Sequence, residues 1–151
     1  MTALVRRYLK TAILFLIVGL ALGAWAMVQR EIGLTFPGAF LISAHTHAIL
    51  VGFVMLMILG VAQWMFPRPA KADVHYSAKR ASAAYWFITV GTAARVVGEL
   101  LRTGSSALWL RWVVVVSSFA QIAGLCLFFY NMWSRIRAVG SEQREKSGEQ
   151  F

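Results

Sequence analysis

The sequence predicts an all-α protein, a transmembrane four-helix antiparallel bundle. Of its 151 residues, 59% are hydrophobic and 14% are charged, whereas a soluble domain has about 45–50% apolar and about 25% charged residues. Four mostly apolar stretches reach the roughly 20 residues that a helix needs to cross a bilayer. Lipid offers no water to the backbone, so such segments must be helices, and short connections make neighbouring helices antiparallel. The predicted spans are about 11–29, 38–66, 81–101 and 112–134.

The first stretch, 11–29, has no charged residue and follows a basic start at Arg6, Arg7 and Lys10. A secretory signal peptide has a similar start, and small residues near Gly23 resemble a cleavage site. The apolar run is, however, longer than the roughly 7–15 residues of a signal-peptide core. We therefore expect the segment to remain as a membrane span.

The second stretch, 38–66, carries no charged residue, but it contains His45 and His47. It is predicted to end before Pro67, because proline cannot continue the hydrogen-bond ladder of a helix.

The third stretch, 81–101, contains Arg95 and Glu99, and the fourth, 112–134, contains no charged residue. The polar tail 140–151 has few residues that could be buried, so it is predicted to be a disordered cytoplasmic segment.

The basic residues predict how the bundle lies in the membrane. The chain has 15 Lys+Arg against 6 Asp+Glu, a net charge of +9. Cytoplasmic loops are enriched in Lys and Arg. Both termini are therefore predicted to be cytoplasmic in a multi-pass protein of the bacterial inner membrane, formed by a single membrane domain, 1–139. No nucleic-acid partner is expected, since the charges flank apolar spans. One side has Arg6, Arg7, Lys10, Arg68, Lys71, Lys79, Arg80, Arg135, Arg137, Arg144 and Lys146, and the other has Arg30, Arg102 and Arg111.

Four ionisable residues lie inside the predicted spans, where such groups are costly and often functional. At about 1.5 Å per residue, His45, His47, Arg95 and Glu99 all fall in the outer half of the bilayer. We therefore expect them to meet in one polar layer. Arg95 and Glu99 are four residues apart and can pair on one helix face. Two interpretations of Arg95 remain open: a structural ion pair, or an anchor for an anionic group such as a heme propionate.

The two histidines are two residues apart, which places them about 200° apart around a regular helix. They cannot both ligate one metal ion from such a helix, so they are predicted to face two different surfaces. Gly52 lies on the His45 side and leaves room for a flat group to approach the backbone. It also continues a row of small residues, Ala44 and Ala48, that suits close packing between helices or between copies of the chain.

Two further polar or sulfur-containing residues in the fourth span have simpler interpretations. Gln121 is predicted to form a hydrogen bond between helices. Cys126, the single cysteine, is predicted to serve in packing. One thiol cannot form an internal disulfide, and neither a disulfide framework nor a cysteine zinc site can be built within the chain.

The segments AHTHAILVGF at 44–53 and GVAQWMFPR at 60–68 resemble the helix of heme–copper oxidase subunit I that carries the HxH motif. They are more closely similar to small four-span proteins described as subunit I-like. A membrane protein family linked to nitric oxide handling, NnrS, has a similar segment. The resemblance covers about a sixth of the chain. It implies that His45 and His47 are axial ligands of heme iron, serving two hemes on opposite faces of the helix.

The chain also departs from the oxidases. They have more spans and a further set of copper-binding histidines, whereas this chain has three histidines in all. His75 is expected about a bilayer thickness from the other two, so a complete heme–copper active site is absent. A heme here is five-coordinate, or takes a methionine, or is shared with a second copy of the chain in a homo-oligomer.

Three functions follow from these observations. The first is a heme b-binding membrane protein that serves electron transfer or gas (O2 or NO) binding in respiration, with a respiratory redox partner and with a site formed by His45, His47, Gly52, Arg95 and Glu99. The second is a copper-binding membrane protein that uses the two histidines. The third is a cofactor-free assembly or accessory subunit of a respiratory complex. No catalytic residue is assigned, because redox chemistry would belong to the cofactor.

Overall fold

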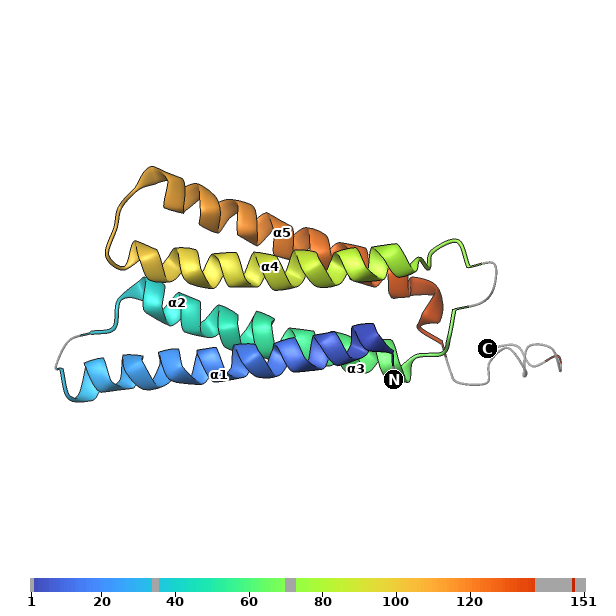
Figure 1. Cartoon of the computed structure of the whole chain (residues 1–151), viewed down its shortest axis with the longest axis horizontal. Helices are drawn as coiled ribbons and strands as arrows, with labels where there is room; N and C mark the ends of the chain where they lie inside the picture. The colour runs from blue at the N-terminus through green and yellow to red at the C-terminus, as the bar shows by residue number, and fades with distance from the viewer. Residues whose placement is uncertain (1, 34–35, 70–72, 138–147, 149–151) are drawn as a thin grey trace.

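The computed structural model describes residues 2–33, 36–69, 73–137 and 148. Over these residues it is an antiparallel bundle of four long helices (Figure 1), which confirms the predicted fold class. The second long helix is continuous but contains a π-helical segment. Apart from residue 148, the predicted tail 140–151 lies outside the described residues. The helices are α1 (Ala3–Glu31), α2 (Ala39–His47) with η1 (Ala48–Met55) and α3 (Leu56–Met65), α4 (Ala78–Arg102), and α5 (Leu108–Met132) followed by the 3-10 turn η2 (Trp133–Arg135).

Three of the four long helices are long and apolar enough to cross a membrane: Ala3–Glu31, Ala39–Met65 and Leu108–Arg135. The fourth, α4, is 25 residues long, as α5 is. It is less apolar, because it contains small and hydroxyl residues as well as Arg95 and Glu99. The crossing of the membrane by α4 therefore stays a prediction.

The outward surface of the bundle is strongly apolar. All six tryptophans are more than half exposed, and many large aliphatic side chains lie beside them. A soluble monomer rarely exposes a continuous apolar surface of this kind. Tryptophan is also enriched where membrane and water meet. The surface therefore fits a lipid environment. The tryptophans are Trp25, Trp64, Trp86, Trp109, Trp112 and Trp133.

The two ends of the bundle are packed differently. We call the end where α1 and α4 begin and α3 and α5 finish the N-terminal end, and the other the opposite end (Figure 1). All four long helices share one core toward the N-terminal end, with residues such as Tyr8, Leu59, Ile88 and Phe128. Toward the opposite end the buried cluster is Ala44, Ala48 and Val96 of α2, η1 and α4, with no residue from α5.

Arg135, the last residue of η2, holds together the helix ends at the N-terminal end of the bundle. Arg135 is only 5% exposed. Its Nε donates to the carbonyl of Pro67 at 2.8 Å, and its NH2 donates to the carbonyls of Gln63 and Phe66 at 2.9 and 3.1 Å. The last carbonyls of a helix have no partner within that helix. Arg135 supplies those partners for α3, and it thereby joins α3 to the end of α5.

Asp73 orders the connection between α3 and α4. Its carboxylate accepts a hydrogen bond from the Ser134 hydroxyl and from the backbone N–H groups of His75 and Tyr76. The Ser134 hydrogen bond is the largest cause that lowers the pKa of Asp73 below its ordinary value of 3.8. The ionised carboxylate therefore stabilises this connection.

The contact between α4 and α5 should be sensitive to a single methyl group at Gly124. A Cβ there would lie 2.7 Å from Ile88 Cγ1 and 3.0 Å from the Ile88 backbone nitrogen. We expect Gly124→Ala to destabilise the protein by about 1–2 kcal/mol, because overpacking outweighs the gain in helix propensity. Thermal unfolding in detergent measures this. Gly104→Ala is the control, since a Cβ at Gly104 meets no atom within 4 Å; an equal loss in both variants would contradict the packing argument.

The lowered pKa of Asp73 predicts a loss of stability in acid. A carboxyl group whose folded pKa is below its unfolded value stabilises the fold above the unfolded pKa, and this contribution disappears as the pH falls through the folded value. Between about pH 5 and pH 2, we expect the melting temperature of Ser134→Ala to fall less than the melting temperature of the wild-type protein. Ser106→Ala, in the exposed loop between α4 and α5, should follow the wild-type curve. A Ser134→Ala curve parallel to the wild-type curve would refute the assignment.

Candidate functional site

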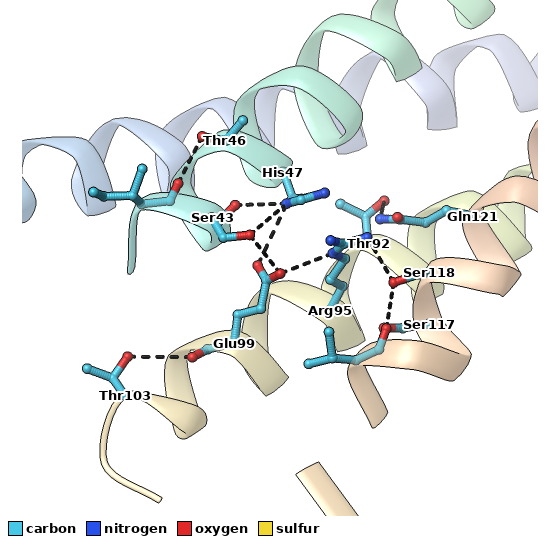
Figure 2. A network of polar contacts seen from close by, with 12 residues as sticks. Ser43, Thr46, His47, Thr92, Arg95, Glu99, Thr103, Ser117, Ser118 and Gln121 are labelled. Carbon is cyan, nitrogen blue, oxygen red and sulfur yellow. Dashed lines mark hydrogen bonds and ion pairs between the residues drawn. The ribbon is translucent and has the colours of Figure 1, made fainter. Parts of the chain in front are cut away.

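The centre of the candidate site is the carboxylate of Glu99, which lies in α4 and is only 3% exposed (Figure 2). Its Oε1 accepts a hydrogen bond from Arg95 Nε at 3.1 Å and from the hydroxyl of Ser43 at 2.8 Å. Its Oε2 lies 3.7 Å from His47 Nδ1 and has no hydrogen-bond partner in the part of the chain that the structure describes. The predicted pairing of Arg95 with Glu99 is thus present within α4, and the Ser43 hydrogen bond to Glu99 joins α4 to α2.

Arg95 extends this network to α5. Its NH1 donates to the hydroxyl of Ser118 at 2.8 Å, and Ser118 in turn donates to the carbonyl of Val114 at 2.6 Å. The NH2 group of Arg95 donates to no other residue in the described part of the chain, and the side chain is 22% exposed. Arg95 is therefore held on one side and keeps a free donor on the other.

The imidazole of His47 is anchored through one nitrogen. Its Nδ1 lies 2.8 Å from the carbonyl oxygen of Ser43, one turn earlier in α2. A carbonyl oxygen only accepts, so Nδ1 must carry the hydrogen. In the neutral ring the lone pair is then on Nε2, which points away from Glu99 (Figure 2). Nε2 forms no hydrogen bond with another described residue, and it is available to a ligand.

His45, also in α2, is anchored in the same way, but its partner belongs to another helix. Its Nδ1 lies 2.8 Å from the carbonyl oxygen of Gly19 in α1, and a Cβ at Gly23 would lie 2.7 Å from its Cε1. The ring is therefore held against α1 with Nε2 as its free nitrogen. The two histidines face different helices, as their spacing predicts. The expectation of one layer holding all four ionisable residues is wrong for His45, which is turned toward α1.

The structure gives the small residues around the histidines a role within the chain. The ring of Phe15 from α1 packs on Gly52, where a Cβ would lie 2.4 Å from Phe15 Cγ. Ala44 and Ala48 are fully buried against α4. The flat group that Gly52 admits here is thus a phenylalanine side chain. The row of small residues packs the helices of one copy, so it is not a free surface for a second copy.

The π-helical segment η1 (Ala48–Met55) begins directly after His47. Such i→i+5 turns are rare, and they occur frequently at functional sites. Sequence reasoning assumed a regular helix and missed this segment, because a short apolar run has the same composition in either form. The wider turn changes the register of the residues that follow the histidines. Beyond it, Ile58 and Met65 face outward, at 55% and 65% exposure.

Two hydroxyl residues that sequence reasoning missed belong to the network, Ser43 and Ser118. Ser43 precedes His47 by four residues, a spacing that places both on one helix face, so that signal was available. Ser118 has no comparable signal. The hydrogen bond expected from Gln121 is present, from its Nε2 to Thr92 Oγ1 at 3.0 Å. Cys126, which was predicted to serve in packing, is exposed on the surface of α5.

The third histidine, His75, lies far from the pair. It is at the N-terminal end, where its ring packs against Tyr130 and its Nδ1 lies 3.9 Å from Asp73. No group of three or more His, Cys, Asp or Glu side chains suited to a metal ion is present among the described residues. A metal at His45 or His47 would therefore need further ligands of another kind, from a methionine, from a cofactor or from another molecule.

No protein-family model, curated protein or solved structure matches this chain. The chemistry of the site is therefore argued from its own residues.

A double-mutant cycle tests whether Arg95 and Glu99 act as one unit. Removing one partner of a buried ion pair leaves an uncompensated charge and costs about 3–5 kcal/mol, whereas replacing both partners by apolar residues is often neutral. We expect Arg95→Leu and Glu99→Leu each to destabilise the protein by about 3 kcal/mol, and the double variant to recover most of that loss. Unfolding in detergent measures the four proteins. Additive losses would contradict the pairing as an energetic unit.

Proposed function

We propose that this chain is a heme b-binding integral membrane protein that serves electron transfer or gas binding in respiration. The observation that supports this most is the anchoring of both imidazoles. Nδ1 of His45 and Nδ1 of His47 each meet a backbone carbonyl at 2.8 Å. Histidines that bind metals usually donate their other ring N–H to a carbonyl or carboxylate, which fixes the tautomer and the ring. The resemblance of segments 44–53 and 60–68 to the oxidase helix agrees with this proposal.

The residues present fit a heme group. His47 Nε2 would hold the heme iron in the polar layer, and His45 Nε2 would do so on the α1 side. The free NH2 of Arg95 would bind a heme propionate, while Glu99 holds the guanidinium in place. A bound heme would supply reversible one-electron chemistry or an iron that binds a small gas. The protein would contribute the ligand, the counter-charge and an apolar surrounding.

A second axial ligand would have to come from outside this chain's histidine set, because His75 lies at the other end of the bundle. We propose a five-coordinate iron, or a homo-oligomer in which a second copy donates its histidine. In such a homo-oligomer, the second copy would meet the outward surface near His47, whose side chain is 22% exposed.

The basic residues support a place in the bacterial inner membrane with both termini cytoplasmic. The end of α3 and the starts of α1 and α4 lie at one end of the bundle (Figure 1), so the Lys and Arg residues at these three points fall on one side. This orientation places the polar layer in the outer half of the bilayer, where a redox partner outside the cell membrane could approach it.

The second candidate function is a cofactor-free assembly subunit. It is favoured by the network among Ser43, Glu99, Arg95 and Ser118, since such a network can set the register of α2, α4 and α5 without any ligand. Copper binding has less support, because the described chain offers no cluster of three metal-binding side chains.

Heme content tests the proposal. We expect protein purified in mild detergent from heme-replete cells to show a Soret band and b-type reduced peaks, and His47→Ala and His45→Ala to lose most of the pigment. The pyridine hemochrome assay measures heme per chain. His75→Ala is the matched control and should keep the wild-type content. Imidazole added to His47→Gly should restore pigment, which a purely structural histidine would not show.

A colourless wild-type preparation would refute heme binding and favour the assembly subunit. Full heme content in both His45→Ala and His47→Ala would equally refute the assigned ligands. Copper in the purified protein in place of heme would favour the copper-binding alternative.

A further inference from the structure

A second candidate site lies at the N-terminal end of the bundle, far from the histidines. It is a pocket of about 910 Å³ between the start of α1, the end of α3, the start of α4 and Arg135. Ligand pockets in proteins commonly have about 300–1,000 Å³. The function proposed above makes no use of this pocket.

The charge of the pocket is positive. Arg7, Arg68 and Arg135 line it, and no Asp or Glu is among the residues that line it. The carboxylate of Asp73 lies in the neighbouring connection, where it accepts hydrogen bonds from Ser134, His75 and Tyr76. Arg7 and Arg68 are exposed side chains that are free to turn toward a ligand. The pocket therefore has an unbalanced positive charge.

The helices that begin at the pocket add to this field. α1 and α4 both start there, and neither has an acidic residue in its first turn. The start of a helix carries a partial positive charge and unpaired N–H groups, which favour anions.

Gln63 supplies an unused donor in the same pocket. Its Oε1 accepts a hydrogen bond from Arg135 NH1 at 3.1 Å. This contact fixes the orientation of the amide group, so the donor Nε2 lies on the side away from Arg135 NH1. That Nε2 is buried and has no hydrogen-bond partner among the described residues. A buried polar group without a partner is uncommon, and a turn of the side chain into the pocket would let this donor reach an anion.

One part of the pocket wall is apolar. Leu4, Trp64 and Phe66 line it, and Trp64 is 62% exposed on the surface that fits a lipid environment. The pocket therefore combines a cationic part with an apolar part at the level where a membrane helix ends. A molecule with a negatively charged group and a hydrocarbon chain matches both parts.

We propose that this pocket binds a phosphate-bearing anion, and that its occupant is the headgroup of an anionic phospholipid. Basic pockets between membrane helices are known to bind acidic headgroups. Arg7 and Arg68 donate to the phosphate, Arg135 contributes its charge while its own donors hold α3, and Trp64 lies beside the acyl chain. The lipid thereby joins the start of α1 to the ends of α3 and α5.

Native mass spectrometry of the full chain in detergent tests this proposal. Phosphatidylglycerol and phosphatidylcholine with identical acyl chains are titrated, and the dissociation constant of the first bound lipid is measured. We expect Arg7→Gln combined with Arg68→Gln to weaken phosphatidylglycerol binding by at least about tenfold. The control combines Arg6→Gln with Arg111→Gln, two exposed arginines outside the pocket, and it has the same net charge. It should bind phosphatidylglycerol as the wild-type protein does.

A preference for phosphatidylglycerol that is lost only in the pocket variant supports the proposal. Displacement of the bound lipid by millimolar inorganic phosphate, with retention of phosphate in the wild-type protein alone, would support the anion site and assign a soluble phosphate as its occupant. Equal affinity in the pocket variant and the control would overturn the proposal, because attraction would then be a matter of net charge. Equal affinity of the wild-type protein for the two lipids would overturn it as well.

Discussion

The buried carboxylate of Glu99 constrains the whole region of the bundle in which it lies. An ionised group away from water is costly unless it is paired and hydrogen-bonded. In this chain the partners come from two helices, with Arg95 one turn earlier in α4 and Ser43 in α2. Arg95 in turn binds Ser118 of α5. The need to pair one charge therefore fixes how three helices face one another.

The same constraint determines what His47 can offer. Its Nδ1 is held by the Ser43 carbonyl and lies near Glu99 Oε2, so the ring presents Nε2 to its surroundings. The π-helical segment begins at the next residue. The residues of α3 therefore follow a different helical register from the residues of this site. Among the described residues, the layer thus leaves one imidazole nitrogen and one arginine NH2 without partners, and these are the two groups that the proposed heme would use.

The two ends of the bundle have different roles: the N-terminal end holds the helices together, and the opposite end carries the candidate site with Glu99. The N-terminal end has the core shared by all four long helices, and Arg135 joins α3 to α5 there. Toward the opposite end, the buried cluster contains no residue of α5. The buried pair of Arg95 and Glu99 therefore lies toward the end where the shared apolar core is smaller. This arrangement lets the protein keep ionisable residues in α4 while the packing at the N-terminal end holds the helices together.

Sequence patterns predicted the parts of this structure that follow from local spacing. The four helices, the Arg95–Glu99 pair and the opposite facing of His45 and His47 all depend on helical periodicity and on residues close in the chain. The partners of His45 and Gly52 could not be predicted in this way, because Gly19 and Phe15 belong to α1 and their contacts depend on how α1 packs. The π-helical segment and the role of Ser118 likewise depend on tertiary packing. The row of small residues predicted a close contact, but not that the contact lies within one copy.

The most direct test of this account is the tautomer of the two histidines in the heme-free protein. Nuclear magnetic resonance of histidine labelled with the heavy nitrogen isotope distinguishes a hydrogen on Nδ1 from one on Nε2, and the variants His45→Ala and His47→Ala assign the signals. The account predicts that both neutral rings carry the hydrogen on Nδ1 and leave Nε2 unprotonated. A hydrogen on Nε2 of both rings would contradict it, because neither imidazole would then be poised to bind a metal through that nitrogen.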